Sequence, residues 1–436
     1  MPSTLLRCAV FFLACLGPLA VRAENWPQWR GPQGDGVSQE AELPLSWDES
    51  TGIAWKCKLP EWGCSTPAIW GDAVLVTSHL EDRELVLLRI NRQTGKIEWQ
   101  RTVGTGSAGR QSLYQKTGQQ RRHQKFHDDQ NLASPSPTTD GKTIIVHFGN
   151  GDLAAYDFAG NQLWRRNLQA DYGDYTIWWG HANSPVLYEN LVLSVCMQDS
   201  CKDLEGQPAP SYVVAHDKQT GQEVWKTPRV TEATAESCDS YTTPIFRRRG
   251  ERLEMIVMGG QMLDAYDPAD GRRLWYLPLV GNRTITGPVA AGDMIYVTQG
   301  MRQPLLGVRP GAAGQRTRRD IVWQVEQATP DSPTPVVRGD WLFLINNEGI
   351  ARCLNARNGK QAWKERLKGQ YRASPLAAAG RVYFLNTTGG CTVVAATSRF
   401  DRLTENQLDD RTLASPAASD GKLFIRGRKT LYCIGK

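Results

Sequence analysis

Eight dipeptides in which proline follows a serine, threonine or glycine are spread along the chain, and they constrain the fold more than any other feature. Each opens a stretch in which turn-forming residues, such as Asp140-Gly141, separate runs of β-branched and aromatic residues, a pattern typical of β-hairpins. The last three prolines follow one another at intervals of about 40 residues, the length that a four-stranded sheet repeated around an axis requires. The repeat therefore predicts an all-β chain organised as a β-propeller. The dipeptides are Thr66-Pro67, Ser134-Pro135, Ser184-Pro185, Thr243-Pro244, Gly287-Pro288, Thr334-Pro335, Ser374-Pro375 and Ser415-Pro416.

A second element recurs downstream of most of these dipeptides and ends in tryptophan. A strand-like run finishes in Asp or Asn, and a glycine turn and tryptophan follow, as in Asp217-Lys-Gln-Thr-Gly221-Gln-Glu-Val-Trp225. In such a turn the Asp or Asn side chain caps backbone amides, and glycine adopts the positive φ. We predict that each tryptophan lies on the outermost strand of its sheet and packs flat against the neighbouring sheet, where its burial contributes several kcal/mol. These tryptophans are interpreted as structural rather than as a platform for a ligand.

The two ends of the chain together complete the repeat. The last copy, within residues 413–436, ends without a tryptophan, whereas the segment 52–59 carries Trp55 ahead of the first proline of the series. Pairing of these segments would supply the missing outer strand and leave no open sheet edge. We therefore predict one domain, residues 24–436, of eight four-stranded antiparallel blades, the eighth shared between the N- and C-terminal strands. The seventh copy also lacks the tryptophan, so its outer strand is expected to be irregular.

Residues 1–23 have the composition of a cleaved signal peptide. Their apolar run is too short to span a membrane, and Val21-Arg22-Ala23 provides a cleavage site. We predict export to the periplasm or the cell exterior with cleavage after Ala23, no transmembrane segment, and a possible association with the cell envelope. The mature chain would carry a net charge of +4, because the +6 of the full sequence includes two arginines of the removed segment. Since its basic residues are dispersed, nucleic acid is not an expected partner.

The cysteines of the sequence do not decide by themselves whether the protein contains disulfides or free thiols. Cys15 could mark lipoprotein processing, but the residues ahead of it lack the usual small residue at the second position before the cysteine. An exported protein permits disulfides, although the pairing cannot be read from the sequence. Cys196 and Cys201 flank a predicted turn and are the best-placed local pair. Cys353 and Cys433 stand at apolar repeat positions and are expected to be packed thiols.

The recurring Asp-x-x-Thr-Gly-x-x-x-Trp element resembles the tryptophan-docking repeat of the pyrroloquinoline-quinone (PQQ) β-propeller superfamily, and the resemblance covers nearly all of residues 24–436. The stretch Asn25-Trp-Pro-Gln-Trp-Arg-Gly-Pro32, followed by Gly34-Asp-Gly36, is similar to the leader of exported bacterial PQQ-binding-like β-propeller repeat proteins. The superfamily includes quinoprotein alcohol dehydrogenases and non-catalytic, BamB-like propellers. The repeat element alone does not decide between these two branches.

For an enzyme, the resemblance implies PQQ, a Ca²⁺ ion that polarises the quinone, and vicinal cysteines beside the cofactor. The chain has no Cys-Cys pair and no Cys-x-x-Cys-His motif for a c-type haem. We therefore predict a non-catalytic scaffold without a cofactor or metal, which binds a protein partner or a small polar ligand in the periplasm or at the cell envelope. The alternative is a PQQ- and Ca²⁺-dependent alcohol or sugar dehydrogenase with its site in the central funnel.

Candidate binding residues precede the dipeptides, at the entry to the innermost strands, which line the central channel of a propeller. Aromatic, acidic and arginine side chains that converge there are typical of a site for a polar ligand. They could equally cap the channel mouth and bind only water. The candidates are Trp62, Asn131, Trp179, His181, Asp239, Tyr241, Arg283, Tyr371 and Arg372, and the acids Asp129 and Asp331 occupy equivalent positions.

Residues 104–130 form an insertion between repeats. His123 and His127 are four residues apart and adjoin Asp128 and Asp129, so they could coordinate a metal if the segment were helical. The segment is rich in Gln, Gly and Lys and lacks an apolar face, which favours a solvated loop that acts as a lid.

Overall fold

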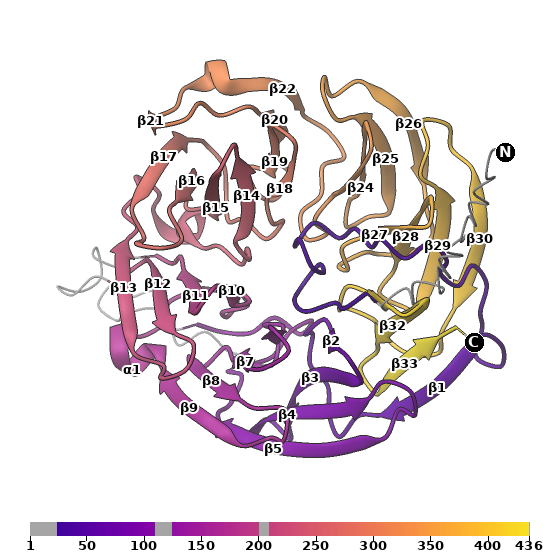
Figure 1. Ribbon diagram of the computed structural model, residues 1–436. Coiled ribbons are helices and arrows are strands. Elements are labelled where there is room, and N and C mark those ends of the chain that lie inside the picture. Colours follow the sequence, from indigo (N-terminus) through magenta and orange to yellow (C-terminus); the bar gives the residue numbers. More distant parts are fainter. Residues whose placement is uncertain (1–23, 110–123, 200–208, 436) are drawn as a thin grey trace, which may run out of the picture.

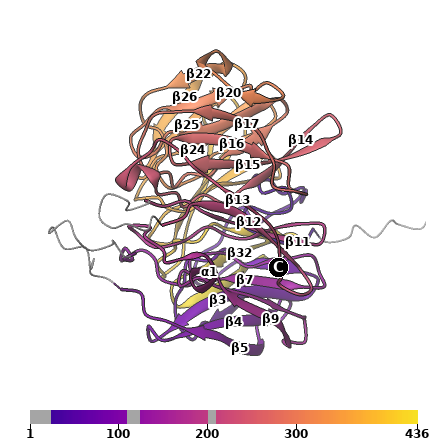
Figure 2. The same cartoon turned by 90° about the vertical axis from the view of Figure 1, so that its left-hand side faces the viewer.

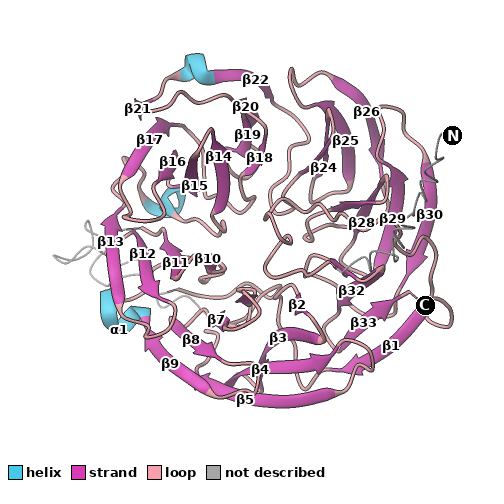
Figure 3. Ribbon diagram, in the orientation of Figure 1, coloured by secondary structure: helices cyan, strands magenta, loops and turns pink. Residues whose placement is uncertain are grey.

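The computed structural model describes residues 24–109, 124–199 and 209–435. Eight sheets stand around a central axis, each with its innermost strand beside the axis and its outermost strand at the rim (Figure 1). The described residues otherwise form loops, one short α-helix and two short 3₁₀ helices (Figure 3). Within these ranges no helix is long and apolar enough to cross a membrane. The predicted all-β, eight-bladed propeller is confirmed.

The blades are numbered in chain order, and their strands run from the axis outwards. Blades 1 to 4 contain, in turn, β2 (Ala68–Trp70), β3 (Ala73–Leu80), β4 (Glu84–Asn91) and β5 (Ile97–Thr105); β6 (Thr138–Thr139), β7 (Ile144–His147), β8 (Asp152–Tyr156) and β9 (Gln162–Asn167); β10 (Val186–Tyr188), β11 (Leu191–Cys196), β12 (Tyr212–Asp217) and β13 (Glu223–Pro228); and β14 (Ile245–Arg249), β15 (Arg252–Gly259), β16 (Met262–Tyr266) and β17 (Arg273–Pro278).

Blades 5 to 8 contain, in turn, β18 (Val289–Ala291), β19 (Met294–Thr298), β20 (Leu305–Val308) and β22 (Ile321–Val325); β23 (Val336–Arg338), β24 (Trp341–Ile345), β25 (Ile350–Asn355) and β26 (Gln361–Arg366); β27 (Leu376–Ala378), β28 (Arg381–Leu385), β29 (Gly390–Ala395) and β30 (Arg402–Gln407); and β31 (Ala417–Ser419), β32 (Lys422–Arg426), β33 (Thr430–Ile434) and β1 (Ile53–Lys58). The remaining elements are α1 (Leu168–Tyr172), η1 (Ala235–Cys238), β21 (Gly314–Gln315) and η2 (Arg318–Asp320).

Each innermost strand begins directly after a proline, because proline lacks the N–H that a strand interior would use and is tolerated at the start of a strand. In blade 2 this proline is Pro137, since β6 begins at Thr138. The expectation that Ser134-Pro135 opens this blade is therefore wrong by two residues. The equivalent dipeptide is Ser136-Pro137, and the sequence repeats the Ser-Pro motif at both places.

The ring closes as predicted through a blade made from both ends of the chain. Strand β1 pairs antiparallel with β33, with Trp55 opposite Cys433 and Cys57 opposite Leu431. The two strands meet at the rim near the C-terminal end of the chain (Figure 1). This pairing gives the inner three C-terminal strands their outer neighbour.

At five junctions a tryptophan docks one blade onto the turn of the next through its indole N–H. The Trp55 indole donates from Nε1 to the carbonyl of Arg92 at 2.8 Å, and a Cβ atom added to Gly95 would lie 2.6 Å from its ring. The same arrangement joins Trp164 to Lys218 and Gly221. Glycine is required in these turns twice over, because φ is positive (+69° at Gly95) and because the indole covers the position of a side chain.

Two blades depart from the predicted pattern. The loop 309–320 of blade 5 folds back over blade 4, where β21 pairs in parallel with β17 and makes that sheet five-stranded. The loop covers Trp275, which is fully buried. In blade 7 the outer strand β30 pairs with β29 over six residues with one register shift, as the outer strands of the other blades also do, so it is no more irregular than its equivalents and the expectation is wrong. Its polar sequence pairs as a strand because ladder hydrogen bonds depend on the backbone and not on a tryptophan.

The described cysteines are free thiols. Cys353 and Cys433 are completely buried among apolar side chains, as expected. Cys196 is also buried with a free thiol, and Cys201, its proposed partner, lies outside the described residues. The structure therefore gives no support for that pair.

Residues 24–40, the leader segment, cross the axis inside the ring, where Figure 1 shows them in indigo. Trp26 exchanges two backbone hydrogen bonds with Ile69 of blade 1, and Ser38 donates its N–H to Ala377 of blade 7. The innermost strand of any blade has an unpaired edge, and the leader segment supplies partners for three of these edges, since Thr139 of β6 also donates its N–H to the carbonyl of Pro27. It thereby closes one end of the channel. The sequence had identified this stretch only by its resemblance to a leader.

Candidate functional site

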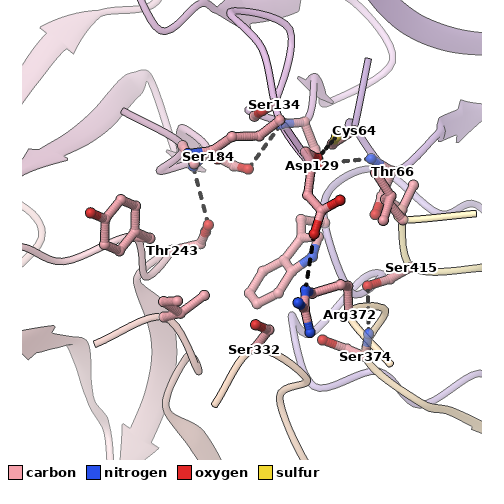
Figure 4. A pocket seen from close by; sticks show the side chains of 18 of the residues that line it. Cys64, Thr66, Asp129, Ser134, Ser184, Thr243, Ser332, Arg372, Ser374 and Ser415 are labelled. Carbon is pink, nitrogen blue, oxygen red and sulfur yellow. Dashed lines mark hydrogen bonds and ion pairs between the residues drawn. The ribbon is translucent and has the colours of Figure 1, made fainter. Parts of the chain in front are cut away.

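The channel above the leader segment is a blind funnel of about 370 Å³. Its volume is at the lower end of the range for small-molecule sites, about 300–1,000 Å³. Trp29 of the leader segment is part of its lining, and side chains from all eight blades form its wall. Figure 4 shows several of them, among them Cys64, Asp129, Thr243 and Arg372. Besides Trp29, the wall includes Cys64, Thr66, His127, Asp129, Gln130, Ser134, Ser136, Trp179, Ser184, Tyr241, Thr243, Arg283, Asp331, Ser332, Asn347, Arg372, Ser374 and Ser415.

The serine or threonine of the repeated dipeptides forms a belt around the funnel. In six places the hydroxyl oxygen accepts the N–H of the equivalent residue of the preceding blade at 2.9–3.1 Å. We name this ring the hydroxyl belt. Its acceptors are Ser136, Ser184, Thr243, Thr334, Ser374 and Ser415, and Figure 4 shows the links between Ser184 and Thr243 and between Ser374 and Ser415. The belt explains why a small hydroxyl residue precedes nearly every proline.

Gly287 interrupts the belt because it has no hydroxyl. A Cβ atom added there would lie 3.2 Å from the Trp29 ring, so the leader segment packs where the side chain is missing. The neighbouring Arg30 fixes this position. Its guanidinium is 2 % exposed and donates to the carbonyls of Thr334 and Pro335 in blade 6 and of Asp35 in the leader segment.

One ion-pair cluster spans the mouth of the funnel. Asp129, at the end of the predicted insertion, pairs with Arg372 of the turn before β27, with 3.4 Å between Nε and Oδ2, and it also binds Arg411 of the turn before β31. Figure 4 shows the carboxylate of Asp129 facing Arg372 across the cavity. The insertion is thereby tied to two blades on the opposite side of the ring.

A second cluster lies on blades 3 to 5. Glu236 of η1 accepts from Nε1 of Trp179 at 2.9 Å and pairs with Arg283 at 3.1 Å. Asp331 receives a hydrogen bond from the amide of Asn347 at 3.4 Å. Burial raises the pKa of the Asp331 carboxyl, and the nearby arginines oppose this effect. Both clusters place arginine next to carboxylate, which fixes the side chains.

Four of the nine candidate residues line the funnel: Trp179, Tyr241, Arg283 and Arg372. Trp62 lies beside the mouth, with the Arg428 guanidinium 4.4 Å from its ring centroid. The binding role of these five residues stays a prediction. Sequence reasoning did not find Trp29, Cys64 or the hydroxyl belt, although the recurrence of Ser and Thr before proline was a usable signal.

The other four candidates are buried in the wall and do not line the cavity, and the expectation that they face it is wrong. Asn131 donates to the carbonyl of Trp62, and Tyr371 donates to that of Lys368. Asp239 accepts the N–H of Trp178, and His181 stacks on Tyr175 with ring centroids 4.7 Å apart. Each is held instead by backbone or ring partners in the surrounding turns.

The described part of the insertion is not a solvated lid. Residues 124–130 pack against blade 2 and the segment before blade 3, with Phe126 buried beside Gly149 and Gly180 and the Gln124 amide donating to the Gly149 carbonyl. His127, Asp129 and Gln130 thereby become part of the funnel wall. His123 lies outside the described residues, so the proposed pair of histidines is not placed.

The funnel does not offer a Ca²⁺ site. Ca²⁺ takes about six to eight oxygen ligands that converge on one point, whereas Asp129 is held by two arginines and Asp331 by an amide. In the described ranges no group of three or more His, Cys, Asp or Glu side chains could hold a metal ion. Burial raises the pKa of the Cys64 thiol to about 11, so this single wall cysteine is a neutral thiol. The residues present do not fit the metal that supports PQQ in the enzymes.

Comparisons with known proteins agree with this architecture. The family model described as "Outer membrane protein assembly factor BamB" matches residues 37–205, 209–310 and 312–404. No curated protein matches the sequence.

Among solved structures, BamB from Moraxella catarrhalis is 12% identical, with 88% of this chain and 99% of that chain covered and a TM-score of 0.60. Quinohemoprotein alcohol dehydrogenase from Comamonas testosteroni is also 12% identical, with 94% and 80% covered and a TM-score of 0.66. At these identities the likeness shows the fold alone.

Proposed function

The chain belongs to the BamB-like family of PQQ-repeat β-propellers, and on that premise we propose that it is an exported, non-catalytic binding scaffold of the periplasm or cell envelope. The mouth face of the ring holds a protein partner, and the funnel holds a small polar ligand. The observation that carries both roles is the blind funnel itself, whose ionic side chains are fixed in pairs and whose carboxylates do not converge on a metal in the described part of the chain.

The chemistry of the wall supports binding over turnover. A dehydrogenase of this fold needs a metal-held quinone and a base that accepts the substrate proton. Asp129 is already engaged by two arginines, and the wall has one cysteine where the enzymes have a vicinal pair. Positioned and paired groups of this kind recognise a ligand without reacting with it.

The mouth face has the composition of a protein interface. Trp178 and Trp179 are partly exposed there, and the Lys125 ammonium lies 4.4 and 4.3 Å from their ring centroids. Arg428 stacks on Trp62 nearby. Tryptophan and arginine dominate the binding energy of protein interfaces. The family description names outer-membrane protein assembly, which supports a location at the cell envelope.

The enzymatic alternative is tested directly. Purified protein is mixed with PQQ, Ca²⁺ and a redox dye, and dye reduction is followed with a panel of alcohols and sugars. We expect no turnover above that of PQQ and Ca²⁺ without protein. Substrate-dependent turnover that is lost in Arg372→Ala would overturn the scaffold proposal.

The partner surface is tested by crosslinking in an envelope extract of the source organism. Wild-type protein and Arg272→Ala, a change at an exposed arginine of the blade 4 turn, are expected to capture the same protein in stoichiometric amount. Trp178→Ala is expected to lose it. Equal capture by all three proteins would place the partner away from the mouth face.

A further inference from the structure

We propose that the funnel binds a small carboxylic acid that carries several hydroxyl groups, of the sugar-acid type. The inference rests on the proposed binding function and names the ligand of that site. Three observations support it: the funnel wall presents hydroxyl donors without acceptors among the described residues, four arginines surround the funnel, and aromatic rings line it.

The hydroxyl belt presents donors to the cavity. Each belt oxygen already accepts a backbone N–H, and in the described part of the chain none has an acceptor for its own O–H. Five of the six line the cavity, and all five are at least nine-tenths buried. The Thr66 hydroxyl lies at the same level and makes no hydrogen bond within the described residues. Buried donors without acceptors cost free energy, and a ligand rich in oxygen atoms satisfies them.

Two arginines add charged donors above the belt. Arg372 and Arg283 both line the funnel. Arg372 belongs to the cluster around Asp129, and Arg283 belongs to the cluster around Glu236. The Asp129 partner of Arg372 is shared with Arg411, which leaves part of the Arg372 guanidinium for a further anion. Arginine forms paired hydrogen bonds with carboxylates, and these are stronger than hydrogen bonds between neutral groups.

Two further arginines are buried behind the wall without a carboxylate in ion-pair distance among the described residues. Arg30 lies under the closed end, beside Trp29, and donates only to backbone carbonyls. Arg426 is 1 % exposed, lies behind Cys64 and donates to Ser65 and Ser78. Burial lowers the pKa of each to about 10, so both remain cations at neutral pH. Their positive potential extends into the funnel and favours an anion there.

The remaining wall fits the uncharged part of such a ligand. The Oδ1 atom of Asp331 has no hydrogen-bond partner in the described structure, and it can accept from a hydroxyl group. The rings of Trp29, Trp179 and Tyr241 provide apolar faces for the carbon skeleton. A cavity of about 370 Å³ admits one or two sugar-sized units rather than a polymer chain.

The ligand class is tested by calorimetry with D-glucuronate, D-glucuronamide and D-glucose. The amide has the size and hydroxyl groups of glucuronate but lacks its charge, so it isolates the carboxylate. We expect glucuronate to bind about tenfold or more tightly than the amide, because charge-assisted hydrogen bonds are roughly twice as strong as neutral ones. Equal affinity for all three probes, or no binding of glucuronate, would overturn the inference.

A matched pair of substitutions locates the site. Thr66→Val removes one free hydroxyl at nearly constant volume and leaves the belt links intact, so glucuronate affinity should fall about fivefold or more. Thr334→Val removes a belt acceptor that does not line the cavity. It should lower the thermal unfolding temperature without changing affinity. Unchanged affinity in Thr66→Val would place glucuronate outside the funnel.

The two proposals fail in different ways. If glucuronate does not bind but Trp178→Ala still loses the crosslinked partner, only the ligand inference is wrong. If PQQ binds in the funnel and supports turnover, the scaffold proposal is wrong. Tight binding of PQQ without turnover, displaced by neither sugar acid nor amide, would also contradict a sugar acid as the ligand.

Discussion

At the scale of single residues, glycine and tryptophan act as one unit at four of the blade junctions, where Trp55, Trp164, Trp225 and Trp323 lie over Gly95, Gly221, Gly271 and Gly359. The indole of one blade covers the turn glycine of the next, so the residue that permits the turn is also the residue that the ring packs on. Gly221 has φ +73°, and a Cβ atom there would lie 2.6 Å from Trp164. Two independent effects therefore require glycine at this position: the positive φ of the backbone, and the indole that occupies the place of a side chain.

Replacement of Gly221 by alanine is expected to destabilise the protein by about 3 kcal/mol or more, because the new methyl group overlaps the Trp164 ring. Gly250→Ala is the control. Gly250 has φ +57°, and nothing lies within 4 Å of its Cβ position, so only the strain of positive φ remains, about 1 kcal/mol. Urea unfolding measures both values. Equal losses would show that the indole does not constrain the turn.

Buried histidines predict a loss of stability in acid. Burial lowers the pKa of His181 to about 4 and that of His147 well below its ordinary value of 6.5. The neutral forms are favoured in the folded protein, so their contribution is complete above about pH 6.5 and is lost as the pH falls towards 4. We expect the unfolding free energy to decrease over this interval, and to decrease less in His181→Gln. Parallel pH profiles for the two proteins would contradict this assignment.

At the scale of elements, the leader segment behaves as a plug rather than as a tail. Its backbone makes hydrogen bonds with the innermost strands of three blades, and Arg30 joins it to a fourth blade. No periodic pattern in the sequence marks this role, because the segment has neither a strand repeat nor a turn signature. Some of its partners, such as Thr334 for Arg30 and Ala377 for Ser38, lie more than 300 positions away in the sequence.

Arg30→Met should release this plug while the ring remains folded. The substitution keeps the length of the side chain but removes the donors to Thr334 and Pro335, which leaves buried carbonyls unsatisfied. Hydrogen exchange is expected to rise within residues 24–40, with little change in the far-ultraviolet circular dichroism. Arg248→Met, at an exposed position of β14, whose hairpin projects from the ring in Figure 2, should leave exchange unaltered. An unchanged leader segment in Arg30→Met would show that strand pairing alone holds it.

At the scale of the whole molecule, the composite blade makes the ring continuous. The Trp55 of β1 docks on blade 1 in the same way that Trp99 of blade 1 docks on blade 2, with its Nε1 bound to the Phe158 carbonyl at 3.1 Å. The contact that closes the ring is of the same kind as the one at this internal junction. The closure formed by the chain ends should therefore be as stable as an internal junction.

Trp55→Ala and Trp99→Ala are expected to lower the unfolding free energy by similar amounts, about 2–4 kcal/mol, because each removes a partly buried indole from one junction. Both variants should unfold in a single calorimetric transition. A separate low-temperature transition in Trp55→Ala alone would identify the closure as the weak seam of the ring.

Local sequence patterns were enough to establish the class of fold, the number of blades, the order of strands and the closure. These follow from proline, turn glycine and tryptophan, whose effects are local and recur in every copy. The same patterns placed Trp179, Tyr241, Arg283 and Arg372 at the funnel, since the start of each innermost strand faces the axis.

Which side chains enter the funnel, and what closes it, depend on the packing of the whole ring. Tyr241 lines the cavity, whereas Asp239, two residues earlier, is buried and accepts the N–H of Trp178, a difference that the spacing of the two residues in the sequence does not predict. The contact of Trp29 with Gly287 joins positions that no local pattern relates. Such contacts join residues that are far apart in the sequence and that meet only when the blades are arranged around the axis. The polarity of the binding funnel depends on them.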